Sequence, residues 1–87
     1  MKKKRFSDEQ LQRASGIDIT AMLQGQGEKL KKQGRVYRWM RYDSTVIDRN
    51  RWYRHSREIG GGPIQFMQHF YGMDFVDAVK YLLDGEE

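Results

Sequence analysis

Residues 52–66 read WYRHSREIGGGPIQF and carry an aromatic and basic strand pattern through three glycines into a helix. Aromatic residues favour strands, and Pro63 suits the first turn of a helix, where its missing N–H is not needed. Apolar side chains then recur at spacings of three and four, at Ile64, Met67, Phe70 and Tyr71. The stretch therefore predicts a strand, a flexible glycine run and an amphipathic helix.

Further strand patterns precede this stretch. Residues 36–42, 45–47 and 51–54 are rich in aromatic and β-branched side chains, which favour strands. Residues 48–50 contain the Asp and Asn that turns favour, and residues 31–35 have the composition of another turn. We expect three short antiparallel strands.

Helix signals lie on both sides of these strands. Ser7 and Gln10 have the spacing of a capping box and predict a short first helix. Asp18 and Asp74 can cap two further helices, whose apolar residues recur at helical spacing: Ile19, Met22 and Leu23, then Phe75, Val76, Val79, Leu82 and Leu83. The predicted fold is α+β, a small antiparallel sheet flanked by N- and C-terminal helices.

Length and composition limit the class of protein. A chain of 87 residues makes one small domain, and we expect residues 1–6 to form a basic, disordered arm. The chain has no cysteine, so it has neither disulfides nor thiolate metal ligands. No apolar run reaches the roughly 20 residues of a membrane span, and the basic start lacks the apolar core of a signal peptide. We therefore expect a cytoplasmic location.

The charge is distributed unevenly. The net charge is +4, yet residues 28–57 contain ten basic and three acidic side chains, whereas residues 58–87 contain one and six. A basic middle segment beside an acidic C-terminal segment predicts one basic face, as expected for a polyanion partner. A solvated surface with internal ion pairs is the simpler alternative.

Taken in order, these segments resemble the N-terminal zinc-binding domain of DnaG-type bacterial DNA primases, over roughly residues 6–84. The resemblance rests on residues 17–19 followed by the Lys-rich 29–37, on Trp52 and Tyr53, on the glycine run, and on residues 64–67 and 72–82. It implies a zinc-ribbon-like sheet that holds single-stranded template DNA for primer synthesis. It also implies a Toprim primase, a helicase or a relaxase as partner, in a DNA replication or mobile-element protein.

The zinc ligands of that family are missing. Its ligand positions correspond to Arg41, Ser44, His55 and Glu58 in this chain. Structural zinc needs four ligands, mostly thiolate or imidazole, so we expect no metal and no other cofactor. The resemblance is thus to cysteine-free relatives from plasmids and integrating elements. Packing of Trp39 or Trp52 on Phe66, Phe70 or Phe75 is our hypothesis for what stabilises the sheet instead.

The candidate site is a set of cations and rings on the strands. Cations that follow phosphates and rings that stack on bases hold single-stranded nucleic acid. Strand alternation decides which rings are exposed; Trp52 is expected in the core, while Tyr37 and Tyr53 could be exposed or buried. The predicted nucleic-acid-binding residues are Lys29, Lys31, Lys32, Arg35, Tyr37, Arg38, Arg49, Arg51, Tyr53 and Arg54, with Trp39 as a further ring.

Other candidates favour simpler interpretations. His55 and His69 are expected to be surface or packing residues, and the glycine run a hinge or tight turn rather than a phosphate seat. No catalytic motif is readable, so we expect an accessory module and not an enzyme. The alternative function is a protein-interaction module that docks a helicase, relaxase or polymerase through the acidic C-terminal helices.

Overall fold

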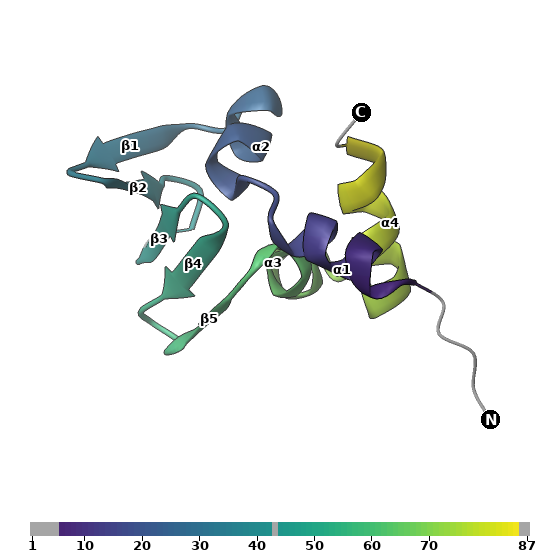
Figure 1. Cartoon of the computed structure of the whole chain (residues 1–87). Helices are drawn as coiled ribbons and strands as arrows, with labels where there is room; N and C mark the ends of the chain where they lie inside the picture. The colour runs from purple at the N-terminus through teal and green to yellow at the C-terminus, as the bar shows by residue number, and fades with distance from the viewer. Residues whose placement is uncertain (1–5, 43, 86–87) are drawn as a thin grey trace.

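The computed structural model describes residues 6–42 and 44–85. Along the chain, helices come before and after a single sheet. In space, the sheet lies to one side of the N- and C-terminal helices (Figure 1). The elements are α1 (Asp8–Ser15), α2 (Ile19–Gly25), β1 (Leu30–Gln33), β2 (Val36–Trp39), β3 (Thr45–Asp48), β4 (Arg51–Arg54), β5 (Ile59–Gly61), α3 (Pro63–Tyr71) and α4 (Phe75–Gly85). The predicted α+β class, an antiparallel sheet flanked by N- and C-terminal helices, is confirmed.

The sheet is an antiparallel meander with the strand order β1-β2-β3-β4-β5. Two edge strands were not predicted. The turn predicted at residues 31–35 is wrong for its first half, because Lys31 to Gln33 pair with β2 and only Gly34 and Arg35 turn. The expected flexible glycine run is likewise wrong for Gly60 and Gly61, which pair with β4. Pairing with a neighbour satisfies backbone groups and overrides the weak strand preference of lysine and glycine.

The helices begin at the predicted residues. The Ser7 hydroxyl accepts from the Gln10 amide at 3.1 Å, while the Gln10 side chain accepts from the Ser7 amide at 2.9 Å. Asp18 and Asp74 cap α2 and α4 through hydrogen bonds of 3.2 and 2.8 Å. Within the described residues, no helix is both long and apolar enough to cross a membrane.

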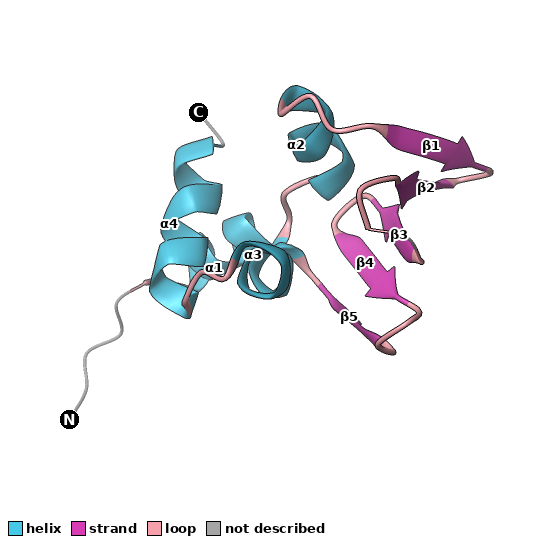
Figure 2. Cartoon of the chain, turned by 180° about the vertical axis from the view of Figure 1, so that it is seen from behind, coloured by secondary structure: helices cyan, strands magenta, loops and turns pink. Residues whose placement is uncertain are grey.

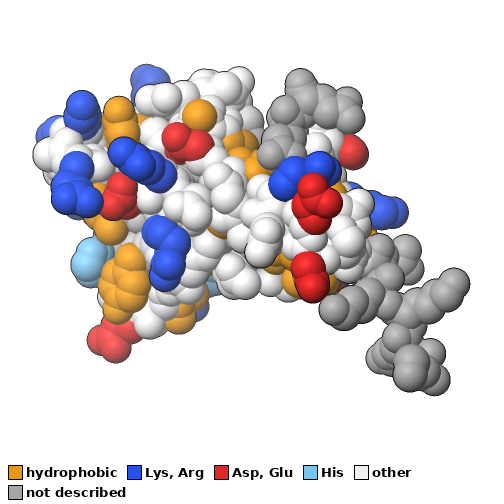
Figure 3. Space-filling view, viewed as in Figure 1, with side chains coloured by type: hydrophobic (Ala, Val, Ile, Leu, Met, Phe, Trp, Pro, Cys, Tyr) orange, Lys and Arg blue, Asp and Glu red, His pale blue; other side chains and the backbone are white. Residues whose placement is uncertain are grey.

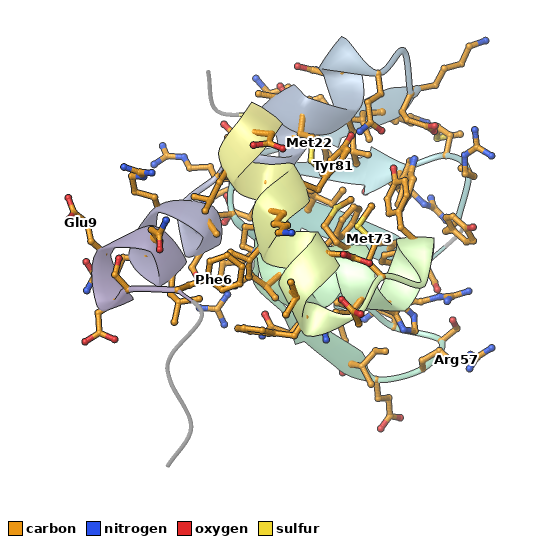
Figure 4. The ribbon with its side chains drawn as sticks, turned by 90° about the vertical axis from the view of Figure 1, so that its right-hand side faces the viewer. Phe6, Glu9, Met22, Arg57, Met73 and Tyr81 are labelled. Atoms are coloured by element: carbon orange, nitrogen blue, oxygen red, sulfur yellow. The ribbon has the colours of Figure 1, made fainter. Side chains whose placement is uncertain are left out.

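Helices α1, α3 and α4 form one layer beside the sheet. Figures 1 and 2 show α1, α3 and α4 packed together on one side of the strands, with β5 leading directly into α3. Helix α2 contacts β3, and Gln26, directly after α2, forms hydrogen bonds with Tyr71 of α3 and Tyr81 of α4. Figure 4 shows Phe6 under α4, and its side chain is buried at 8% exposure. The arm predicted for residues 1–6 is therefore wrong for Phe6, while residues 1–5 lie outside the described residues.

Two tryptophans connect the sheet to α3. The ring centroids of Trp39 lie 5.3 Å from Phe66 and 5.0 Å from Phe70. Those of Trp52 lie 5.8 and 5.2 Å from the same two rings. The expected aromatic packing is present, and each such pair contributes about 0.5–1.5 kcal/mol beyond its buried area. Phe75 is the exception, since it is 45% exposed and its ring meets that of Phe6, edge to face, at a centroid distance of 6.4 Å.

Candidate nucleic-acid interface

Strand alternation divides the predicted site residues between the two faces of the sheet. Directly paired residues of antiparallel strands lie on the same face. Ile47 and Trp52 are paired, buried and turned toward the helices, which defines the helix face. The opposite face, here the open face, comprises Lys31, Gln33, Val36, Arg38, Val46, Asp48, Arg51, Tyr53 and Gly60.

A single row of the open face crosses all the strands. Lys31 pairs with Arg38, which pairs with Val46. Val46 pairs in turn with Tyr53, and Tyr53 with Gly60. The row therefore begins with two cations at one edge of the sheet and ends with an aromatic ring near the other. Arg51 lies on the same face, two residues before Tyr53.

Tyr53 is the exposed ring of this row. Its side chain is 39% exposed and meets the His55 ring edge to face at a centroid distance of 4.9 Å. Its Cδ1 would lie only 3.0 Å from a Cβ added to Gly60, so the ring rests on the bare backbone of that glycine. A ring supported from below and open to solvent can stack on a nucleobase.

A second group of predicted residues gathers at one end of the sheet. The β1–β2 and β3–β4 turns both lie at this end, and each has its first residue in the left-handed region, Gly34 with φ 66° and Arg49 with φ 60°. This pattern is typical of two-residue hairpin turns of type II′. Lys32, Arg35, Tyr37 and Arg49 line a depression of about 490 Å³ beside α2.

Arg54 does not belong to either group. It pairs with buried Thr45 on the helix face, and its guanidinium lies 5.3 Å from the Tyr42 ring centroid and 5.5 Å from that of Phe70. Its Nη1 is 3.1 Å from Nε2 of His69. The interpretation of Arg54 as a surface contact is therefore corrected, because alternation turns it into the aromatic core, where cation–π contacts hold it.

Trp39, predicted as a further ring of the site, is buried and does not belong to it. The ring is 1% exposed, and its indole N–H donates to Oε1 of Glu28 at 3.0 Å. Trp52, expected in the core, is 5% exposed and donates to the Gly62 carbonyl at 2.9 Å. Lys29 is exposed just before β1, and its carbonyl accepts from the Met40 amide at 3.1 Å.

Two of the positions that the resemblance assigns to zinc ligands, Ser44 and His55, are joined by a backbone hydrogen bond. The Ser44 carbonyl accepts from the His55 amide at 2.8 Å, and its hydroxyl accepts from the Ser56 amide at 3.2 Å. Arg41 instead makes two 3.0 Å hydrogen bonds to the carboxylate of Glu28. The described part of the chain holds no cluster of three or more His, Cys, Asp or Glu side chains suited to a metal, so these residues do not fit a zinc ion.

The glycine run does not form an open phosphate loop. Gly60 and Gly61 pair with β4, and the Gly62 amide donates to Oε1 of Gln65 at 3.0 Å. A Cβ on Gly60 would overlap the Trp52 carbonyl oxygen. The glycines thus allow β5 to approach β4 closely, a use that the sequence pattern does not reveal.

The surroundings shift the pKa values of several titratable groups, among them His69 and Glu28. Burial lowers the pKa of His69, and the nearby charges of Arg54 and Arg57 lower it further. The pKa of Glu28 is lowered by its hydrogen bonds to Arg41 and then to Trp39. His69 stacks on Trp52 at a centroid distance of 5.5 Å, so of the two expected roles, surface residue or packing residue, it has the second.

Comparison with known proteins adds one relative. No family model matches the chain. The chain is 34% identical over 87 residues to an uncharacterized protein of Bacillus anthracis, and the match covers 97% of this chain and 25% of the relative. This chain thus spans about a quarter of the length of the relative.

Proposed function

We propose that this chain is a non-catalytic module that binds single-stranded nucleic acid, and single-stranded DNA in particular, on the open face. The observation that carries the proposal is the row that joins Lys31 and Arg38 to the exposed ring of Tyr53. Neighbouring strands lie about 4.8 Å apart, so Lys31 and Tyr53 are separated by roughly 14 Å across three such spacings. That span can place phosphates on the cations while a base stacks on the ring.

The distribution of charge over the molecule supports this assignment. Figure 3 shows Lys and Arg side chains gathered over the strand half, on the left of the view, with a few acidic side chains among them. Lys31 and Arg51 are both exposed on the open face. Lys31 and Arg38 are directly paired on this face, which concentrates positive charge at one edge of the sheet.

The resemblance to DnaG-type primase domains adds a proposed cellular role and proposed partner proteins. In this proposal the module presents template DNA to a Toprim primase, helicase or relaxase, in a replication or mobile-element protein of the cytoplasm. The order of helices, antiparallel strands, glycine run and C-terminal helices supports it. The chemistry of primer synthesis would then belong to a catalytic domain outside this chain.

Titration of a labelled oligonucleotide at several salt concentrations tests the binding proposal. Tyr53→Ala should weaken binding by about 5- to 100-fold, since one base stack contributes roughly 1–3 kcal/mol. Lys31→Ala should flatten the dependence of log affinity on log salt by about 0.7, the value for one phosphate contact on a single strand. RNA and DNA oligonucleotides of equal sequence show which of the two is preferred.

Lys80→Ala is the matched control, because Lys80 is an exposed lysine on α4, away from the sheet. It removes the same charge and should leave both the affinity and the salt slope near the wild-type values. Absence of binding at low salt, or equal effects of Lys80→Ala and Lys31→Ala, would refute the open-face proposal.

A second function is favoured by the surface of α4. Phe75 and Tyr81 are 45% and 40% exposed on this helix, and Asp74, Asp77 and Asp84 surround them in sequence. Exposed rings beside acidic groups suit a basic protein partner, such as a helicase, relaxase or polymerase. This function predicts that Phe75→Ser abolishes co-purification with the partner while oligonucleotide binding stays unchanged.

A further inference from the structure

Two depressions meet at the end of the sheet where the β1–β2 and β3–β4 turns lie. The first, here the α2 groove, measures about 490 Å³. The second, here the turn hollow, measures about 300 Å³. Arg35 and Arg49 line both of them. The two depressions therefore form one continuous basic surface around the end of the sheet.

The turn hollow connects this surface to the open face. Arg51 and Asp48 line the hollow together with Arg35 and Arg49, here the turn arginines. Arg51, at the start of β4, and Asp48, at the end of β3, are both open-face residues. From Tyr53 to Arg51 is two residues along β4, or about 7 Å. A nucleic-acid strand that lies across Tyr53 can therefore reach the turn arginines without leaving the protein surface.

The α2 groove has the chemistry of a nucleotide site. Lys32, Arg35 and Arg49 supply cations, and the partly buried Tyr37 supplies a ring. The one acidic side chain lining the groove, Asp18, is engaged as the cap of α2, where it accepts from the Ala21 amide at 3.2 Å. The volume lies within the roughly 300–1,000 Å³ of small-molecule pockets.

Arg49 is held in this position at a conformational cost. Its φ of 60° is a left-handed conformation that glycine or asparagine usually occupies. Its carbonyl accepts from the Ile19 amide at 2.7 Å, and the neighbouring Asn50 side chain donates to the Ser15 carbonyl at 3.0 Å. Strained residues held by surrounding contacts cluster at binding sites. The strained backbone thus carries a charged side chain where glycine would fit without strain.

We propose that a bound single strand leaves the open face at Arg51, passes between Arg35 and Arg49, and places a terminal nucleotide in the α2 groove against Tyr37. This inference rests on the proposed function and adds the path of the strand. It predicts that the turn arginines contact only oligonucleotides that are long enough to extend beyond the open face.

Oligonucleotides of two lengths test the path. The short one, of about 4 nucleotides, covers only the open face, and the long one, of about 12, extends beyond it. With the long oligonucleotide, Arg35→Ala and Arg49→Gly should each weaken binding about 5-fold and flatten the salt slope by about 0.7. With the short one, both variants should bind as the wild type does, whereas Tyr53→Ala should weaken both lengths.

Photo-crosslinking locates the terminal nucleotide independently of affinity. A 5-iodouridine at one end of the long oligonucleotide should crosslink to Tyr37, and one at its centre to Tyr53. Probes labelled at either end show which end enters the groove.

Each alternative outcome has a separate meaning. If Arg35→Ala and Arg49→Gly leave the long oligonucleotide unaffected while Tyr53→Ala weakens it, the path is wrong and the open-face function stands. Equal losses at both lengths would also overturn the path, because the turn arginines would then belong to the open-face site. Wild-type protein that binds neither length refutes the proposed function itself. Polyglutamate binding that requires Arg35, without oligonucleotide binding, would assign the groove to an acidic peptide.

Discussion

Replacing Arg49 with glycine should stabilise the fold while it removes a cation. A left-handed conformation costs an ordinary L-residue about 1–2 kcal/mol, and Arg49 adopts one with φ 60°. Glycine avoids that cost but adds about 0.4–1 kcal/mol of conformational freedom to the unfolded chain. The backbone hydrogen bond from Ile19 to the carbonyl of residue 49 is kept. The net effect of Arg49→Gly is a stabilisation of about 0.5–1 kcal/mol.

Thermal unfolding followed by circular dichroism measures this effect. For a domain of 60–100 residues, 1 kcal/mol corresponds to about 4–8 °C, so the melting temperature should rise by about 2–8 °C. Arg49→Ala is the matched control, because it removes the same side chain and keeps the left-handed strain; its melting temperature should not rise. If Arg49→Gly melts at or below the temperature of Arg49→Ala, the strain argument is refuted.

Three further predictions concern the core. Trp52→Ala should destabilise the fold by about 3–5 kcal/mol in chemical denaturation, since the ring is 5% exposed and packs on α3; an unchanged melting temperature would contradict a supporting role for the aromatic cluster. Gly60→Ala should destabilise the fold far more than Gly25→Ala, because a Cβ at Gly60 overlaps the Trp52 carbonyl oxygen while one at Gly25 meets no atom within 4 Å. The pKa of His69 is lowered in the folded state, by burial first and then by Arg54. As the pH falls, the unfolded chain therefore binds a proton at His69 before the folded protein does. Stability should therefore fall as the pH drops from about 7 toward 5, and His69→Gln should flatten that part of the curve of melting temperature against pH.

The sequence predicted elements whose signals are local. The capping side chains of Ser7, Asp18 and Asp74 mark helix starts because each one satisfies an amide three residues away. Pro63 marks the start of α3 for a different local reason, because its missing N–H is not needed at the first position of a helix. β1 and β5 could not be predicted, because their residues have weak strand preferences and are strands only through pairing with β2 and β4.

The sequence predicted which residues could bind nucleic acid, but it did not predict which of them lie together on one surface. A basic, aromatic sheet without cysteine, with helices before and after it, can be predicted from the sequence, because composition, caps and periodicity are properties of neighbouring residues. The folded chain adds the assignment of faces: Tyr53 and Lys31 lie on the open face, while Arg54 enters the aromatic core. Register, set by pairing across strands, assigns each side chain to a face. The meeting of Arg35 and Arg49 beside α2 likewise depends on turns that are distant in sequence and adjacent at one end of the sheet.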